Sequence, residues 1–418
     1  MVLTIHRGTR QIGGNCVELI CDGHRLLLDA GSPLDGPDSP SAATPIPPTL
    51  DLSRPIDGLV ISHPHMDHYG LLDSLPADWP VWSGEPTEEL MRLTAVVGGR
   101  RTRQTFRHYR SGEPFFVGPF AITPYLTDHS AFDAHMLLVE VSGKRLLYSG
   151  DFRRTGRKAI LVQRMLEHPP TGVDVLLLEG TTLGRPGGYP TESDLEVQFI
   201  ELFRRTRGRV FVTWSAQNID RTVAIYRACL RAGRTLILDV YSADVLERMA
   251  RFADRLPHLG CDNLKVVVTG KIARMYDNPA RLDNEAFVEK CASSGNAFSA
   301  AKLAGGNQDV IMLRPSLWTD FERKGVTLNP DDAWVFSMWA GYLQENDYPD
   351  LRRRFEEAGA TIQQIHTSGH AAPDDLVRFA QAVAPKCLVP IHGEAWDRCL
   401  HRFDNVRRLN DGEQFEVV

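Results

Sequence analysis

The sequence predicts an α/β protein of two domains, with the second domain inserted into the first. Its 418 residues exceed what one ordinary hydrophobic core supports. Residues before about 184 form short apolar stretches typical of strands, whereas helical and strand patterns alternate between 191 and 336. After residue 360 the first pattern returns. We therefore expect a first domain made of residues 1–190 and 361–418, and a second made of residues 191–360.

The first domain is expected to consist mainly of strands. These are predicted at residues 16–21, 25–29, 58–62, 80–83, 120–125, 136–141 and 144–149, with helices at 85–97 and 160–166. Residues 184–190, rich in glycine and proline, indicate a linker.

The second domain is expected to hold a parallel sheet flanked by helices. Helices are predicted at residues 191–206 and 219–232, and strands at 209–214, 234–240, 264–268, 310–313 and 333–336. A segment at 360–367, a helix at 373–384 and a strand at 386–391 would then return to the first domain.

A cluster of histidines follows the apolar run 58–61, where binding groups are often placed. It reads Ser62-His63-Pro64-His65-Met66-Asp67-His68. Neutral imidazole and carboxylate oxygen are ligands for zinc or manganese. The cluster offers more ligands than one tetrahedral ion with an open position needs, which suggests two ions. The alternative is a polar loop with chance histidines, which 14 histidines in 418 residues make improbable.

Three more residues that can bind metals stand at or after the ends of apolar runs. They are His129 in residues 126–130, Asp151 in 146–152 and His392 in 387–394. Alone, each has an ordinary structural interpretation as a core or surface residue. Each is nevertheless of a residue type that can bind a metal ion.

The pattern His-x-His-x-Asp-His after an apolar strand resembles the signature of the metallo-β-lactamase fold. Glu179 at the end of an apolar run, the segment His366-Thr367-Ser368-Gly369-His370 and the opening residues 8–15 resemble the β-CASP nucleases, and among these the ribonuclease J family. The resemblance covers nearly the whole chain. It implies an αββα metallo-β-lactamase sandwich with an inserted α/β β-CASP cap domain.

The resemblance also implies roles for individual residues. It assigns one ion to His63, His65 and His129, the other to Asp67, His68 and His392, with Asp151 bridging. Two Zn²⁺ ions are expected, with Mn²⁺ as the alternative. The catalytic residues would be Asp67, Glu179 and His370, and Glu179 would pair with His370; the alternative for Glu179 is a structural salt bridge. His366, Ser368 and Gly369 would hold a 5′ phosphate, and Ser215 another phosphate, unless Ser215 merely belongs to a helix cap.

The function implied is hydrolysis of single-stranded RNA, chiefly 5′-to-3′ from a 5′ monophosphate, with endonuclease activity as a second mode. A DNA nuclease of the same family is one alternative, although family members acting on DNA generally lack the histidine at the position of His392. A small-molecule lactonase or esterase is the other. The chain stops soon after His392, so the family's extra C-terminal domain is expected to be missing, and a homodimer is left open.

The composition is that of an ordinary globular protein, with a net charge of −6. Such a charge works against nucleic-acid binding, which relies on local basic groups. Arginines do cluster at positions 100, 101, 103, 107 and 110, and again at 153, 154 and 157; phosphate contacts and ordinary surface pairs explain them equally well. Seven scattered cysteines without CxxC spacing indicate reduced thiols and a cytoplasmic protein. The apolar runs are too short for a membrane span.

Overall fold

The computed structural model describes residues 1–34, 45–98, 100, 102–276, 282–306, 308–345 and 347–417. The chain divides into two compact units. The first consists of Met1–Ala95, Arg100–Tyr189 and Gly369–Val418, and the second of Val96–Gly99 and Pro190–Ser368. The second unit is therefore inserted into the first along the chain.

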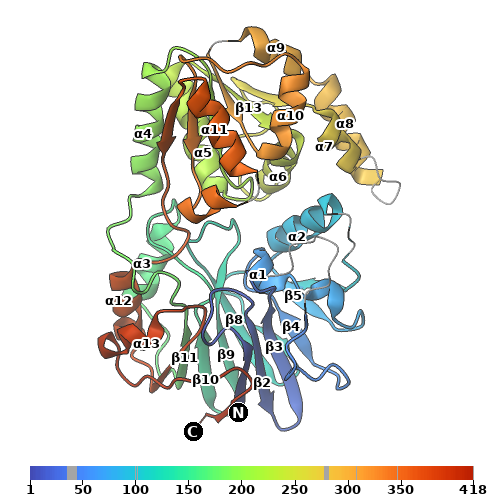
Figure 1. Cartoon of the computed structure of the whole chain (residues 1–418). Coiled ribbons are helices and arrows are strands. Elements are labelled where there is room, and N and C mark those ends of the chain that lie inside the picture. Colours follow the sequence, from blue (N-terminus) through green and yellow to red (C-terminus); the bar gives the residue numbers. More distant parts are fainter. Residues whose placement is uncertain are drawn as a thin grey trace. The chain divides into compact units, whose positions relative to one another are not determined.

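Two sheets form the centre of the first unit (Figure 1). One has the order β20 (Gln414–Glu416), β1 (Val2–Arg7), β2 (Cys16–Cys21), β3 (His24–Ala30), β4 (Gly58–Val60), β5 (Val81–Ser83) and β6 (Phe106–His108). The other has the order β19 (Cys387–Pro390), β11 (Val175–Leu178), β10 (Lys144–Tyr148), β9 (His135–Val141), β8 (Phe120–Leu126) and β7 (Phe115–Val117).

Three hydrophobic clusters show that this unit has four layers. The largest lies between the sheets and joins residues such as Leu28 of β3 and Leu177 of β11. A second packs the outer face of the β10–β11 sheet against α3 (Ala159–Glu167), α12 (Pro373–Val383) and α13 (Trp396–Cys399). A third covers the outer face of the β3–β4 sheet with residues of α1 (Met66–Tyr69) and α2 (Glu85–Val97). The layers are helix, sheet, sheet, helix, which confirms the predicted αββα sandwich.

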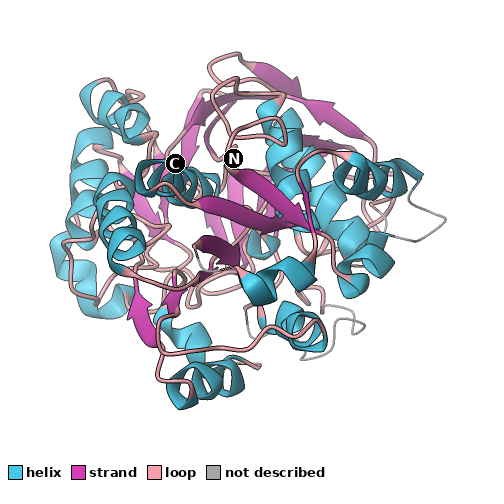
Figure 2. Ribbon diagram, turned by 90° about the horizontal axis from the view of Figure 1, so that it is seen from above, coloured by secondary structure: helices cyan, strands magenta, loops and turns pink. Residues whose placement is uncertain are grey.

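The second unit contains one seven-stranded sheet in which every neighbouring pair is parallel. Its order is β15 (Ala297–Phe298), β14 (Leu264–Val267), β13 (Thr235–Asp239), β16 (Asp309–Met312), β12 (Val210–Thr213), β17 (Ala333–Phe336) and β18 (Thr361–Gln364). Parallel neighbours require crossover connections, which here are helical. Figure 2 distinguishes these helices from the strands by colour.

The helices of the second unit alternate with its strands, except that α7 and α8 both lie between β14 and β15. They are α4 (Glu192–Arg205), α5 (Ile219–Ala232), α6 (Val240–Ala250), α7 (Gly270–Tyr276), α8 (Leu282–Ser293), α9 (Ala300–Gly305), α10 (Pro315–Arg323) and α11 (Tyr348–Glu357). Short 3₁₀ turns stand at Leu72–Ser74, Ala340–Gln344 and Leu400–Arg402. Thr191 begins α4 with a capping box completed by Asp194. Within the described residues, no helix combines the length and apolar character needed to cross a bilayer.

The segment after residue 360 differs from the expectation that it returns at once to the first domain. Strand β18 pairs in parallel with β17, Ala333 lying opposite Thr361, so it completes the sheet of the second unit. The boundary between the units falls between Ser368 and Gly369 instead. The reason is tertiary, because the sequence of a short strand carries no mark of the sheet that it joins.

Candidate metal centre

The histidine motif occupies the loop after β4 and the single turn of α1. His63 and His65 lie on the loop, and Asp67 and His68 lie on α1. The loop is held close to the neighbouring strand end, since the amide of Asn15 donates to the Asp67 carbonyl at 3.1 Å. A Cβ on Gly31 would stand 1.7 Å from that carbonyl oxygen. Only glycine therefore permits this approach, which fixes the motif against the end of β3.

Seven predicted ligands converge at this edge of the two sheets. His129 follows β8, Asp151 follows β10 and His392 follows β19. The ligand atoms form two groups, and within each group all atoms lie within 4.8 Å of one another. The groups are His63, His65 and His129 on one side, and Asp67, His68, Asp151 and His392 on the other.

Asp151 lies between the two groups. Its Oδ2 is 3.1 Å from His68 Nε2 and 3.7 Å from His392 Nε2 in its own group. The same oxygen is 3.7 Å from His63 Nε2 in the other group. One carboxylate thus faces donors of both groups, the geometry that a bridging ligand requires.

Several of these atoms are buried without a hydrogen-bond partner among the described residues. They are His63 Nε2, His392 Nε2 and Asp151 Oδ1. Leaving a buried polar atom unsatisfied costs roughly 1–3 kcal/mol. Convergent, unsatisfied nitrogen and oxygen lone pairs are the donor set of a zinc-like cation, so the residues present fit a metal.

Burial sets the charge of the histidines. It lowers the pKa of His63 and His129 well below 6.5, that of His65 to about 4, and that of His392 less strongly. These imidazoles are therefore neutral at neutral pH, the form that binds metals. His68 differs: burial opposes protonation, but the carboxylates of Asp151, Asp67 and Asp29 outweigh it and raise the pKa of His68 well above 6.5.

Glu179 and His370 form a pair beside Asp151. Glu179 directly follows β11 and is fully buried, and its Oε2 lies 2.9 Å from His370 Nδ1. Its Oε1 accepts from the amide of Phe152 at 3.0 Å. Burial disfavours the imidazolium, but Glu179 and Asp151 reverse this and raise the pKa of His370 to about 9. His370 Nδ1 is 3.8 Å from Asp151 Oδ2, so a cationic imidazole stands next to the shared carboxylate.

Gly369 joins this pair to the first group of ligands. His129 Nδ1 lies 2.6 Å from the Gly369 carbonyl oxygen, which places the N–H on Nδ1 and leaves the lone pair of Nε2 available to a metal ion. A Cβ at Gly369 would meet Ser130 Oγ at 2.7 Å. The glycine predicted to hold substrate phosphate therefore has a packing role as well.

Three predicted substrate residues, Ser215, His366 and Ser368, belong to the second unit. Ser215 follows β12 and its carbonyl accepts from the amide of Asn218, which caps α5. This hydrogen bond agrees with the helix-cap interpretation of Ser215. Phosphate binding by the three residues stays a prediction.

Arginines of the two clusters are engaged in structural contacts. Arg100 pairs with Asp73 at 3.6 Å, and Arg103 donates to the Asp73 carbonyl at 3.1 Å. The fully buried Arg153 faces Asp128 at 3.4 Å, and Arg154 faces Asp375 at 2.7 Å. Position 101 lies outside the described residues. For these four arginines, pairing with neighbouring groups of the protein therefore explains the side chain better than contact with a substrate phosphate.

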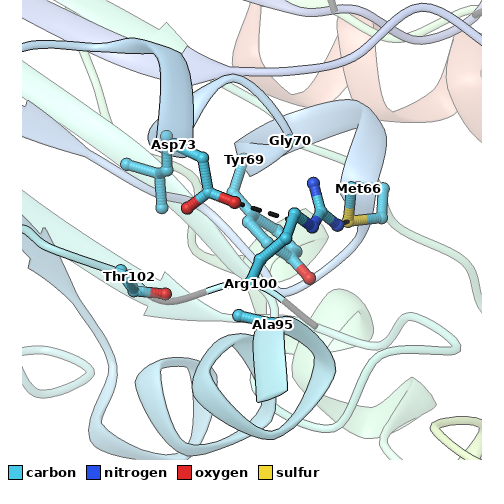
Figure 3. A pocket seen from close by; sticks show the side chains of 8 residues that line it. Met66, Tyr69, Gly70, Asp73, Ala95, Arg100 and Thr102 are labelled. Atoms are coloured by element: carbon cyan, nitrogen blue, oxygen red, sulfur yellow. Dashed lines mark hydrogen bonds and ion pairs between the residues drawn. The ribbon is translucent and has the colours of Figure 1, made fainter. Parts of the chain in front are cut away.

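A small cavity of about 10 Å³ lies beside α1 and is lined in part by Met66, Tyr69 and Arg100 (Figure 3). Arg100 Nη2 lies 3.9 Å from Met66 Sδ there. A volume of this size holds about one water molecule. The cavity is therefore too small for a nucleotide and is not the substrate site.

Sequence reasoning did not single out the residues behind the ligands. Asp29 is the penultimate residue of β3 and has a left-handed φ of 57°. It accepts from His68 Nδ1 at 2.7 Å and from the amide of Ser62 at 2.7 Å. Asn15 lies 3.0 Å from His392 Nδ1. A signal for Asp29 existed, because it too is a carboxylate closing an apolar run.

Comparison with known proteins finds two family models that match parts of this chain. Residues 24–213 match the model of a β-lactamase superfamily domain, and residues 358–398 match that of a Zn-dependent metallo-hydrolase RNA specificity domain. A crystal structure of a protein of unknown function from Enterococcus faecalis V583 superposes with a TM-score of 0.76 at 18% identity, covering 99% of each chain. At that identity the likeness shows the fold alone.

Curated relatives match over most of this chain. Ribonuclease J of Helicobacter pylori (strain B128) is 23% identical over 98% of the chain, and that of Sinorhizobium meliloti (strain Sm2011) is 24% identical over 95%. Ribonuclease J of Mycobacterium tuberculosis (strain CDC 1551) is 26% identical over 92%. The matches cover 60%, 70% and 67% of these relatives, so the chain spans well under their full length.

Proposed function

We propose that this chain, which combines a metallo-β-lactamase domain with a metallo-hydrolase RNA specificity domain, is a metal-dependent ribonuclease acting on single-stranded RNA. The observation that carries the proposal is that Asp151, a member of one group of candidate ligands, also lies 3.7 Å from His63 of the other group. The region matching the RNA specificity model supplies both His370 and His392 to that site. Relatives named ribonuclease J favour RNA over DNA and over a small ester or lactone.

The site would hold two divalent ions. His63, His65 and His129 would bind one ion, Asp67, His68 and His392 the other, and Asp151 both. Imidazole-rich donors favour Zn²⁺, with Mn²⁺ as the alternative. When bound, such a pair of ions lowers the pKa of water and neutralises charge on a phosphoryl group.

The chain's own residues contribute acid chemistry. Glu179 holds His370 Nδ1 and, together with Asp151, keeps the imidazole protonated, so that the imidazolium would act as an acid towards substrate. An imidazolium there would stabilise negative charge on a phosphate oxygen or protonate the leaving oxygen. Asp67 is the partly exposed carboxylate of its group and would face the reacting centre.

The proposed 5′-to-3′ direction of RNA degradation rests on one short segment of this chain. His366, Ser368 and Gly369 offer an imidazole, a hydroxyl and a backbone amide within four residues, a set suited to a terminal phosphate. With Ser215 as a further phosphate contact, they support 5′-to-3′ exonuclease action on a 5′ monophosphate, with endonuclease action as the second mode. A homodimer and a cytoplasmic location stay predictions from the sequence.

A substrate panel tests the proposal. The protein is loaded with Zn²⁺ or Mn²⁺ and offered 5′-phosphorylated RNA, 5′-hydroxyl RNA, single-stranded DNA and a small lactone. We expect RNA to be cut fastest and the 5′ monophosphate form to be preferred. Turnover of the lactone with intact RNA would replace the proposal by a small-molecule hydrolase, and equal turnover of DNA would broaden it to a general nuclease.

A further inference from the structure

Asp29 is the centre of a buried hydrogen-bond network in the first unit. Its Oδ2 lies 2.7 Å from His68 Nδ1, 2.7 Å from Ser62 Oγ and 2.8 Å from the hydroxyl of Tyr148. Asp29 and Tyr148 are both fully buried, and they stand on β3 and β10 of different sheets. An ionised carboxylate only accepts hydrogen bonds, so all three neighbours must donate to it.

This requirement fixes the orientation of Asn15. The Tyr148 hydroxyl has one proton, which it gives to Asp29, so towards Asn15 its oxygen acts as an acceptor. The Asn15 Nδ2 amide lies 2.9 Å from that oxygen and donates to it. The other amide atom, Oδ1, must then point away, and it lies 3.0 Å from His392 Nδ1. A Cβ at Gly8 would stand 2.8 Å from Oδ1, so glycine leaves the space that the amide needs.

The orientation of Asn15 in turn fixes the proton on His392. The Asn15 Oδ1 atom lies 3.0 Å from His392 Nδ1 and can only accept a hydrogen bond. His392 Nδ1 must therefore carry the hydrogen, because otherwise two lone pairs would face each other. The backbone amide of Gly13 also approaches Nδ1, but from 3.4 Å, and is the weaker contact. With the hydrogen on Nδ1, His392 Nε2 keeps its lone pair. That atom is buried, has no hydrogen-bond partner among the described residues and lies 3.7 Å from both Asp67 Oδ2 and Asp151 Oδ2.

We propose that Tyr148 and Asn15 are positioning residues that link the Asp29 carboxylate to His392 by hydrogen bonds. Through them His392 is given an acceptor at Nδ1, so that its Nε2 keeps the lone pair that would bind a metal ion. Asp29 accepts directly from His68 Nδ1, so one carboxylate orients two histidines that reach the site from different strand ends. Burial and the Asp29 carboxylate raise the pKa of Tyr148 well above 10, which keeps the phenol a donor. The metal part of this inference rests on the two-ion centre proposed above, whereas the tautomer part does not.

The tautomer is measurable in the metal-free protein. ¹⁵N-labelled histidine reports by NMR which ring nitrogen bears the hydrogen, and a His392→Gln spectrum assigns the signal. We expect Nδ1–H for His392 in the wild-type protein and a mixture of tautomers in Tyr148→Phe, although Tyr148 does not touch His392. A wild-type Nε2–H form, or an unchanged signal in a folded Tyr148→Phe protein, would overturn the inference. The wild-type spectrum alone tests it if the variant fails to fold.

Metal affinity gives the second readout. Competition with a chelator measures the dissociation constant of each Zn²⁺ ion. We expect Tyr148→Phe and Asn15→Leu to weaken one ion about 10- to 100-fold and to leave the other nearly unchanged. Tyr276→Phe is the matched control, because it removes another buried tyrosine that donates to a carboxylate, Asp244, in the second unit. Equal loss of both ions, or the same loss in the control, would show a merely structural role. A wild-type protein without two ions would instead refute the proposed centre.

Discussion

Replacing Glu179 by glutamine should move the pH range in which the enzyme works. The change removes the carboxylate at 2.9 Å from His370 Nδ1 but keeps the size of the side chain. Glu179 and Asp151 raise the pKa of His370 to about 9 against the effect of burial. Without Glu179 we expect the pKa of His370 to fall to its ordinary value of about 6.5 or below.

The size of the effect follows from these two values. If the imidazolium is the active form, the rate falls as pH rises through its pKa. At about pH 8, roughly nine-tenths of His370 is protonated at a pKa of about 9, but only about 3% at a pKa of about 6.5. The variant should therefore lose about 30-fold in kcat/KM at that pH and much less near pH 6. Bound cations would lower both pKa values together, so the displacement between the two profiles is the quantity to measure.

The assay is kcat/KM on 5′-phosphorylated RNA from about pH 5.5 to 9.5, with bound metal measured at each pH. Glu88→Gln is the matched control, because Glu88 also pairs with a histidine, His108, outside the metal centre. It should leave the profile unchanged. A pH-independent loss in Glu179→Gln, or a loss that follows the metal content, would refute the acid role of the pair.

Three further predictions concern the metal centre and the choice of substrate. Asp151→Ala should abolish RNA cleavage and lower bound metal, because its carboxylate faces both ligand groups; two tightly bound ions in this variant would contradict that. Glu179→Gln and His370→Gln should be non-additive, the double variant being about as slow as the worse single one; a loss equal to the product of the two would separate the residues. Ser368→Ala should reduce the preference for a 5′ monophosphate more than internal cleavage, and a circular RNA cut as fast as the linear form would favour an endonuclease.

Local patterns recovered elements that carry either a helical repeat or a short continuous apolar run. The helices Glu85–Val97 and Ile219–Ala232 and the strands Cys16–Cys21 and Ala333–Phe336 end where the sequence predicts. Strand β1 (Val2–Arg7) was not predicted, and β18 was assigned to the wrong sheet, because strand pairing between distant segments leaves no local mark.

For the candidate site, the sequence indicated the metal-binding residue types but not the residues that orient them. The ligand residues carry their chemistry in their own side chains, so strand-end histidines and aspartates could be found by type. Tyr148 and Asn15 could not, since their importance lies in hydrogen bonds across 133 positions of sequence between β10 and the residue before β2. In the sequence, Tyr148 is indistinguishable from the other buried residues of its strand. Only the fold places its hydroxyl next to Asp29.

Metal-dependent cleavage of RNA is the most direct test of the central claim. The protein is stripped of metal with a chelator and offered 5′-phosphorylated single-stranded RNA while Zn²⁺ or Mn²⁺ is titrated back. We predict no cleavage by the stripped protein and full activity once about two ions per chain are bound. Cleavage that survives stripping, or intact RNA with two ions bound, would contradict the account.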